Sequence, residues 1–569
     1  MAQSVMVRAG EKVPAPRRGA WTLAGERIFQ VPPLPLPEIV TSEALMADCP
    51  SVQLFLERAE AANPAFELTT SNAASVQQIV RRLDGIPLAI ELAASRVKLL
   101  QPSEIASRLE ESFKLLTGGP SNVLPHHQTL ERAIDWSYDN LEPDQQSLFS
   151  QLSVFRGGFT LPACGAVMGA ENEFDALDAL GELVDKSLVR TDSLLEETRY
   201  YMLEPLREYA ADRITSEERV QVDGRHANYF LELAERASPE LRGPQQVEWL
   251  EHLETEHDNI RASLAWGLAA GESDLVQRTS AALSWFWLIR RHSTEAMDWF
   301  ERALAMEGGS SGSRAWLLIQ SGFVGSVIYH DELDRCLAAI IEGRDQFANL
   351  GDGQGLLTAQ AYEAVLMWSK RDLESSNRLF SDVQQTAEAI EFGWLIGFCD
   401  FFLGVNAWYL GKMELAVDHY NRSLDLFRSS SDTTMTAWLL SRMANVSLGS
   451  KDLAGATTVL EECMSLMEQV GDRHGIGAAF LGLGISAHLS GDADEAQSLL
   501  GEAQTHLREG GGGQGLSWPL SNVYINTSTH EAIFEVTERY QASLSLPTDE
   551  WAKMVIDDAE SLDKLNRPN

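Results

Sequence analysis

Few residues of this chain stand at the spacings that catalysis or metal binding requires. His126 and His127 are adjacent, and adjacent positions on a helix do not face one another, so we do not expect them to bind a metal. The carboxylates of Glu110 and Glu111 are expected to be solvated. No Ser-His-Asp or Cys-His arrangement can be assembled for nucleophilic catalysis. The sequence therefore predicts no catalytic residue, no metal site and no enzyme activity.

The stretch RRLDGIPLAIELAASR (81–96) poses a sharper question. Gly85-Ile86-Pro87 either separates two helices or also contacts a ligand. Gly85 can adopt the left-handed conformation that ends a helix predicted over 72–84, and Pro87 suits the first turn of the next helix. Local physics alone predicts a joint between two helices.

Residues 1–217 predict three regions, and the second of them contains this joint. Residues 1–40 are expected to be irregular, because VPPLPLPEI (31–39) is extended and cannot sustain a helix. Residues 41–120 carry four helical patterns that begin at Ser, Asn or Pro and end at Asn-Pro or Gly, which predicts a helical subdomain. Residues 121–217 predict a winged helix with a small β-hairpin. Its helices are expected at 129–139, 143–153 and 174–185, and its strands in the β-branched or aromatic runs 187–192 and 199–203.

Residues 218–515 repeat. Six helical segments recur every 40 residues, with a small residue at their sixth position and a large apolar residue at their tenth. A helix pair that cannot bury its face alone must stack on its neighbours, which predicts an α-solenoid. The pattern resembles the tetratricopeptide repeat (TPR), with longer helices or connectors. Residues 516–569 are expected to form a cap and tail. The small positions are Ala296, Cys336, Ser376, Ala416, Ala456 and Ala496, and the large ones are Phe300, Ile340, Phe380, Tyr420, Leu460 and Leu500.

Composition limits the function classes. The formal charge of −38 argues against a general nucleic-acid binder, whose electrostatic footprint is basic. The five cysteines lack CxxC spacing and predict reduced thiols in a cytoplasmic protein. No signal peptide is visible in the first residues. The apolar run 393–410 contains Asp400 and Asn406 and falls in register with the repeat, so we expect a buried helix and no membrane span.

Taken in order, these segments resemble a known family, the bacterial signal-transduction ATPases of the STAND class, close to AfsR- and LuxR-type regulators with an NB-ARC-like core. The resemblance covers about residues 20–215 and continues into the repeats. It is carried by motifs such as RRLDGIPLAIELAASRVKLL (81–100), LPHHQTLERAIDWSYDNL (124–141), LSVFRGGFTLPAC (152–164) and YYMLEPLREYAADRI (200–214).

The family resemblance implies that Gly85, Ile86 and Pro87 form a vestigial adenine contact. It also places Met202-Leu203-Glu204 where the family has a phosphate-sensing histidine, and Leu203 cannot donate a hydrogen bond. The family's phosphate-binding loop, GxxxxGK[ST], does not occur in these 569 residues. We therefore expect no cofactor, and ADP or ATP only if that loop is supplied by other sequence. The resemblance begins abruptly near residue 20, as in the rear half of such a regulator.

Three functional hypotheses follow. The first is a non-catalytic regulatory or scaffold protein that binds a protein or peptide on the concave face of its solenoid. The second is an adenine-nucleotide-dependent switch or transcriptional regulator whose phosphate-binding loop lies in missing sequence. The third is a DNA-binding regulator, which the winged helix disfavours, because residues 125–215 contain 17 acidic and 7 basic side chains. The first hypothesis is preferred; the partner and the oligomeric state stay open.

Overall fold

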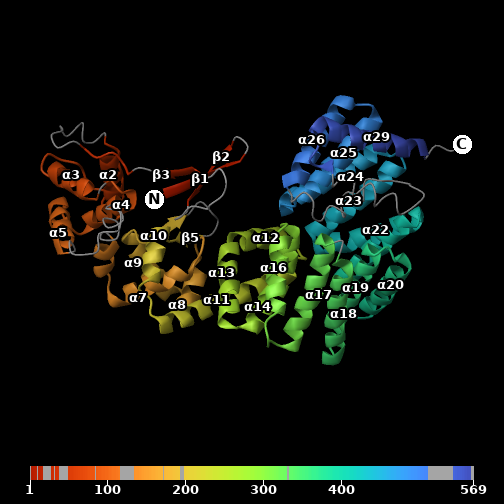
Figure 1. Cartoon of the computed structure of the whole chain (residues 1–569), viewed down its shortest axis with the longest axis horizontal. Helices are drawn as coiled ribbons and strands as arrows, with labels where there is room; N and C mark the ends of the chain where they lie inside the picture. The colour runs from red at the N-terminus through yellow and green to blue at the C-terminus, as the bar shows by residue number, and fades with distance from the viewer. Residues whose placement is uncertain are drawn as a thin grey trace. The chain divides into compact units, whose positions relative to one another are not determined.

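The structure is a computed structural model of the chain (Figure 1). It describes residues 2–8, 11–16, 27–30, 33–37, 49–83, 85–115, 134–170, 172–192, 198–329, 332–509 and 543–565. The chain divides into two compact units, Met1–His226 and Ala227–Asn569. Each unit is described by itself below.

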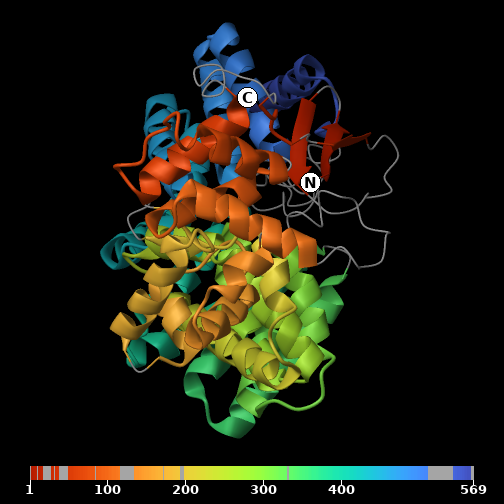
Figure 2. The same cartoon turned by 90° about the vertical axis from the view of Figure 1, so that its left-hand side faces the viewer.

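The first unit begins with a three-stranded antiparallel sheet in the order β2-β1-β3 (Figure 1 and Figure 2). Its strands are β1 (Ala2–Arg8), β2 (Glu11–Pro16) and β3 (Arg27–Gln30). The prediction of an irregular segment over 1–40 is therefore wrong for these residues. Prolines did not prevent pairing, because those of β2 lie on an edge strand, where a missing N–H is tolerated. Residues 33–37 have no regular secondary structure.

A helical subdomain follows, as predicted. Three of its helices begin with proline in the first turn, which fits the missing N–H there. Their apolar faces meet in a core that includes Phe55, Ile79, Ile90 and Ile105, all fully buried. The elements are α2 (Pro50–Ala62), α3 (Ala73–Arg82), α4 (Pro87–Ala94), the 3₁₀ helix η1 (Ser95–Lys98) and α5 (Pro102–Leu115).

The winged helix comes next, and its predicted hairpin is confirmed by antiparallel pairing of Thr191 with Tyr200. The sequence analysis missed α8, because its short length and its internal glycine, Gly165, gave no clear helical period. Thr160 caps this helix, and left-handed Gly169 ends it. The described elements are a helical segment over 134–139, α7 (Pro143–Gln151), η2 (Leu152–Val154), α8 (Leu161–Met168), α9 (Glu173–Asp185), β4 (Arg190–Asp192), β5 (Arg199–Tyr201) and α10 (Glu204–Ala211).

Ion pairs join the helical subdomain to the winged helix inside the first unit. Glu91 of α4 is almost completely buried and accepts a hydrogen bond from Arg190 of β4. Arg58 of α2 lies 3.6 Å from the other oxygen of Glu91. The helix that starts at the Gly-Ile-Pro joint is thereby tied to the wing.

The second unit is a solenoid of antiparallel helix pairs, as predicted (Figure 1). Helix α11 (Ser216–Glu240) leads into it from the first unit. The other helices are α12 (Gln246–Thr255), α13 (His257–Ala270), α14 (Ser273–Ala282), α15 (Ser284–Ile289), α16 (Ser293–Leu304), α17 (Ser311–Ile328), α18 (Leu333–Leu350), α19 (Gly353–Ser369), α20 (Leu373–Ala389), α21 (Gly393–Tyr409), α22 (Met413–Ser430), α23 (Thr433–Gly449), α24 (Leu453–Val470), α25 (Arg473–Ser490), α26 (Ala493–Glu509) and α29 (Thr548–Leu565).

The turns between helices account for the 40-residue period. From α18 to α24, each helix ends at a left-handed residue that follows it directly or after one residue, and the N-cap of the next helix comes immediately afterwards. Most of these N-caps are aspartates. Gly471, for example, ends α24, and Asp472 then accepts a hydrogen bond from the Gly475 N–H of α25 at 3.1 Å. Helices of 17 or 18 residues joined by such short turns give the long repeat. The helices, and not the connectors, are therefore longer than expected for a TPR.

The small and large positions of the repeat are buried, and two of the large ones pack against glycines of the preceding helix. A Cβ on Gly404 would lie 2.6 Å from the ring of Tyr420, and one on Gly484 would lie 2.8 Å from Leu500. Both pairs join a glycine of a first helix to the large tenth position of its partner helix. Asp400 and Asn406 of α21 are buried, and no helix among the described residues is long and apolar enough to cross a membrane.

The solenoid closes on itself between its first helices and the turns before α23 and α25. Gln246 of α12 donates to Asp432 at 3.1 Å and accepts from the Thr434 N–H at 2.8 Å. The ring centroids of Trp285 (α15) and Trp394 (α21) lie 5.5 Å apart. These residues are separated by more than a hundred positions in the sequence. We refer to these contacts and to the Arg291–Asp472 ion pair described below as the closure contacts.

Candidate functional site

Gly85 occupies the joint expected from the sequence. Helix α3 ends at Arg82 and α4 begins at Pro87, while Gly85 has a φ of 66°. The Leu34 N–H donates to the Gly85 carbonyl oxygen at 2.9 Å, and a Cβ on Gly85 would lie 2.2 Å from the Leu34 oxygen. Gly85 is buried, Ile86 is half-buried and Pro87 is exposed. The joint is thus confirmed, and the close approach of the 33–37 segment explains the glycine. The adenine contact stays a prediction.

The Met202-Leu203-Glu204 triplet lies at the end of the wing, apart from this joint. Leu203 is the N-cap of α10, and its side chain makes no capping hydrogen bond. Met202 lines a pocket together with Arg156, Gly157, Gly158 and Arg207. The empty space there, counting the open mouth, is about 720 Å³. This pocket combines two guanidinium groups with left-handed glycine backbone.

The second helix of the helix-turn-helix, α9, presents an acidic face. Asp175, Asp178, Glu182 and Asp185 are exposed on it, and Phe174 beside them is 75% exposed. A DNA phosphate backbone would be repelled by this face. The exposed side of α9 therefore lacks the basic footprint of a DNA-reading helix.

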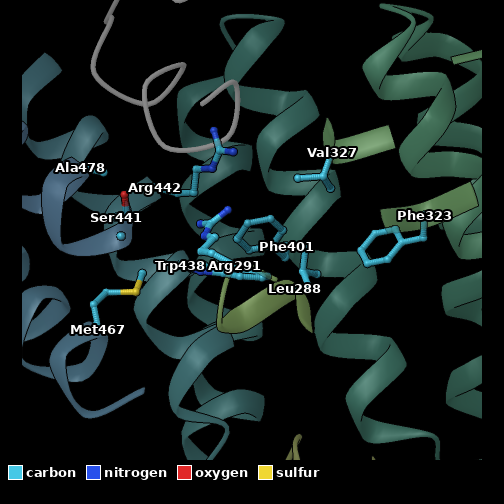
Figure 3. Close-up of a pocket in the computed structure, with 11 residues that line it drawn as sticks. Leu288, Arg291, Phe323, Val327, Phe401, Trp438, Ser441, Arg442, Met467 and Ala478 are labelled. Atoms are coloured by element: carbon cyan, nitrogen blue, oxygen red, sulfur yellow. The ribbon is translucent and has the colours of Figure 1, made fainter. Parts of the chain in front are cut away.

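A pocket on the inner side of the solenoid lies next to the closure contacts (Figure 3). Most of its lining comes from the first helices of successive pairs. Phe323 and Val327 stand on one side and Met467 on the other, with two arginine side chains between them. The empty space between the lining atoms, counting the open mouth, is about 550 Å³. The lining residues are Leu288, Arg291, Phe323, Val327, Phe401, Trp438, Ser441, Arg442, Met467, Gly475 and Ala478.

One of these two arginines is paired. Arg291 donates from Nε and Nη2 to the two carboxylate oxygens of Asp472, at 3.1 and 3.3 Å. Asp472 is fully buried, and despite this burial, which raises a carboxyl pKa, the charge of Arg291 is the leading cause that holds the pKa of Asp472 below its ordinary value. Trp438 also donates its indole N–H to Asp472, at 3.3 Å. A carboxylate 181 residues away thus balances the charge of Arg291.

The second arginine, Arg442 of α23, is only 4% exposed. Its Nη1 has no hydrogen-bond partner in the described part of the chain. The guanidinium lies 5.9 Å from the centroid of the Phe401 ring, and burial lowers the pKa of Arg442. Among the described residues, no carboxylate forms an ion pair with it. An unpaired buried cation of this kind is costly unless something anionic approaches it.

Glu254, His257 and His292 form a cluster whose ligand-type atoms lie within 4.8 Å of one another. The Nε2 of His257 accepts the Trp287 indole N–H at 3.2 Å, which uses the lone pair of that nitrogen. Burial is the main cause that lowers the pKa of His257 to about 4, so its ring is neutral near pH 7. His292 lies 3.2 Å from Glu254. These hydrogen bonds account for the cluster, of which only His257 is buried.

The remaining predicted sites are simple to place. All five cysteines are free, four of them are buried, and burial raises the pKa of Cys336 to about 11, which confirms packed thiols. Glu110 and Glu111 lie on α5. His126 and His127 lie outside the described residues.

The sequence analysis missed Arg291, Arg442 and Asp472. Arg442 stands in an otherwise apolar and small-residue helix, and that local contrast could have marked it. No local signal could have joined Arg291 to Asp472, because their contact depends on how far the solenoid curves.

Comparison with known proteins locates the clearest similarity in the winged helix. Residues 141–215 match the family described as a winged helix-turn-helix domain. Rv0890c of Mycobacterium tuberculosis, named as a candidate HTH-type transcriptional regulator, is 39% identical over 284 residues, which are 50% of this chain and 31% of that protein. Rv0894 of the same organism, an uncharacterized protein, is 37% identical over 196 residues, covering 34% of this chain and 47% of that protein. The chain thus spans less than half the length of these relatives.

Two solved structures have a related helical arrangement. One is a STAND protein with a tetratricopeptide repeat sensor from Pyrococcus horikoshii, with 12% identity, a TM-score of 0.46, and coverage of 91% of this chain and 75% of that one. The other is a Rap protein complexed with competence and sporulation factor, with 10% identity, a TM-score of 0.39, and coverage of 61% and 93%. The chain thus combines a winged helix-turn-helix domain with a helical solenoid, and it is similar over part of its length to an HTH-type transcriptional regulator.

Proposed function

We propose that the chain is a non-catalytic regulatory or scaffold protein whose solenoid recognises a protein or peptide partner on its inner face. The observation that carries this proposal is the inner-face pocket, which combines apolar walls with a buried arginine that has no anionic partner in the described part of the chain. Recognition sites for partners are concave and mostly apolar, with a few convergent polar groups. The proposal places the protein in the cytoplasm, where free cysteines stay reduced.

The winged helix has a structural role in this proposal. The ion pair of Glu91 with Arg190 ties it to the helical subdomain, and the acidic face of α9 is unsuited to DNA. Direct DNA binding is not expected.

The experiment is peptide selection on the immobilised full chain, followed by hydrogen exchange of the complex. A bound peptide should slow exchange in the inner helices α21, α23 and α25 more than in the outer helices α20, α22 and α24. Protection confined to residues 49–215 would contradict the proposal, because recognition would then lie outside the solenoid.

A second candidate function is a switch or transcriptional regulator that depends on ADP or ATP. It is favoured by the Gly85-Ile86-Pro87 joint and by the pocket at Met202, in which Arg156 and Arg207 meet left-handed glycines. Titration calorimetry of the chain with ADP and ATP tests it. We expect no binding at micromolar concentration, since the phosphate-binding motif is missing from these residues. An isotherm that Pro87→Ala abolishes would instead establish the nucleotide switch.

A further inference from the structure

The inner-face pocket has one positive charge that no described group balances. Arg291 and Arg442 both line it, and Asp472 neutralises Arg291 through two hydrogen bonds. Arg442 is 4% exposed and lacks a partner at Nη1. The Tyr409 side chain is hydrogen-bonded to the Arg442 guanidinium, and Tyr420 is the other group that influences its charge; both tyrosines are neutral near pH 7. The described lining therefore has a surplus of one positive charge.

The walls around this charge are apolar. Leu288, Phe323, Val327, Phe401 and Met467 contribute aliphatic, thioether or aromatic surface. A ligand that fits must therefore present one anionic group to Arg442 and an apolar body to the walls. A guanidinium presents parallel N–H groups that match the two oxygens of a carboxylate. A phosphate, which carries up to two charges and has no apolar body, would suit this lining poorly.

We propose that the inner-face pocket binds a monocarboxylate with an apolar body, held by a charge-assisted hydrogen bond from Arg442. This inference deepens the proposed function, on which it rests, by naming the chemistry of the ligand. Two sources share that chemistry: the free C-terminus of an apolar peptide and a small apolar carboxylic acid.

The closure contacts explain why such a site exists only in the closed solenoid. Leu288 and Arg291 come from the start of the unit, whereas Trp438, Arg442 and Met467 come from later repeats. The Arg291–Asp472 pair and the edge-on and tilted ring contacts of Trp285 with Trp394 and Trp438 hold these two sets of residues together. A bound ligand would contact both sets and would stabilise the closed form by mass action.

The test is titration calorimetry on the full chain with matched probes. The peptide source is represented by N-acetyl-Leu-Phe with a free carboxylate and by its C-terminal amide. The small-acid source is represented by 4-phenylbutanoate and by 4-phenylbutanamide. Inorganic phosphate is the third anion. We expect at least one carboxylate to bind. Its amide should bind about tenfold more weakly or not at all, because a hydrogen bond to a charged group is lost. The carboxylate that binds more tightly shows whether the ligand is a peptide C-terminus or a small carboxylic acid.

Arg442→Met supplies the matched variant, with Arg302→Met on the outer surface of α16 as its control. Removing a buried unpaired charge while keeping the length of the side chain should leave the melting temperature unchanged or raised. The same variant should lose the preference for carboxylate over amide, and Arg442→Lys should retain part of it. The comparison of carboxylate with amide uses the unmodified chain. The inference can therefore still be refuted if Arg442→Met fails to fold.

Three results would overturn the inference: no carboxylate probe binding at low millimolar concentration, equal affinity for acid and amide, or phosphate binding as tightly as the carboxylates. The proposed function has a separate outcome. If selected peptides protect the inner helices but acid and amide bind alike, the solenoid still recognises partners and only the role of Arg442 is wrong.

Discussion

The closure of the solenoid should depend on Asp472, and Asp472→Asn is the sharpest test. Asp472 is fully buried, accepts from Arg291 at 3.1 and 3.3 Å, and caps α25 through the Gly475 N–H at 3.1 Å. Asparagine keeps an acceptor for the cap and nearly the same volume. The substitution therefore removes the negative charge, and it replaces Oδ2, which accepts from Arg291 and Trp438, by an amide nitrogen that cannot accept.

The expected loss in the free energy of unfolding follows from the arginine that is left unpaired. Arg291, with a side chain that is 19% exposed, would be left without its carboxylate. Removing one partner of a fully buried pair costs about 3–5 kcal/mol, and partial exposure of the arginine reduces this to about 2–3 kcal/mol. The folded-state pKa of Asp472 lies below its ordinary value of 3.8. The stabilisation by ionised Asp472 is therefore complete above about pH 4. It is lost as the pH falls through the lower pKa that Asp472 has in the folded state.

Urea unfolding at pH 7 measures this loss, with tryptophan fluorescence as the signal. Asp452→Asn is the matched control, because Asp452 caps α24 through the Gly455 N–H at 3.0 Å but is exposed. We expect the control to change the free energy of unfolding by less than about 0.5 kcal/mol. Arg291→Met and the double variant complete a thermodynamic cycle. Equal effects of Asp472→Asn and Asp452→Asn, with no coupling in the cycle, would refute the role assigned to the ion pair.

Three further predictions concern the joint, a core histidine and the repeat. Gly85→Ala should lower the melting temperature more than Gly169→Ala does, since both glycines have positive φ but only a Cβ on Gly85 meets a backbone oxygen, at 2.2 Å; equal shifts in calorimetry would contradict this packing. His257 has a folded-state pKa of about 4 against an ordinary 6.5, so the free energy of unfolding should fall as the pH drops from about 6.5 towards 4. In urea titrations His257→Gln should flatten that slope, and the control His252→Gln should not. Gly404→Ala should destabilise the chain by about 1–3 kcal/mol, because its Cβ would lie 2.6 Å from a tyrosine ring; a neutral result in thermal unfolding would mean that the helix pair can separate without cost.

Local features of the sequence were sufficient for the wing, the repeat and most of the helices, but not for α8. Gly85 and Pro87 mark a joint because conformation at a glycine and a proline depends on the residues themselves. The 40-residue period is equally local, since each left-handed cap and each aspartate N-cap acts on the helix beside it. Local propensity failed for the strands β1, β2 and β3, whose structure depends on pairing with another strand.

The inner-face pocket was decided by tertiary structure alone. The position where a solenoid returns to its own beginning depends on small rotations summed over many helix pairs, and no residue encodes that sum. Only the closed unit brings Arg291 to Asp472 and leaves Arg442 without a carboxylate among the described residues. The sequence by itself determined that this protein is a winged helix followed by a regular solenoid. Which charges meet inside the solenoid was fixed by its curvature, because electrostatic pairing depends on distance in space and not on spacing along the chain.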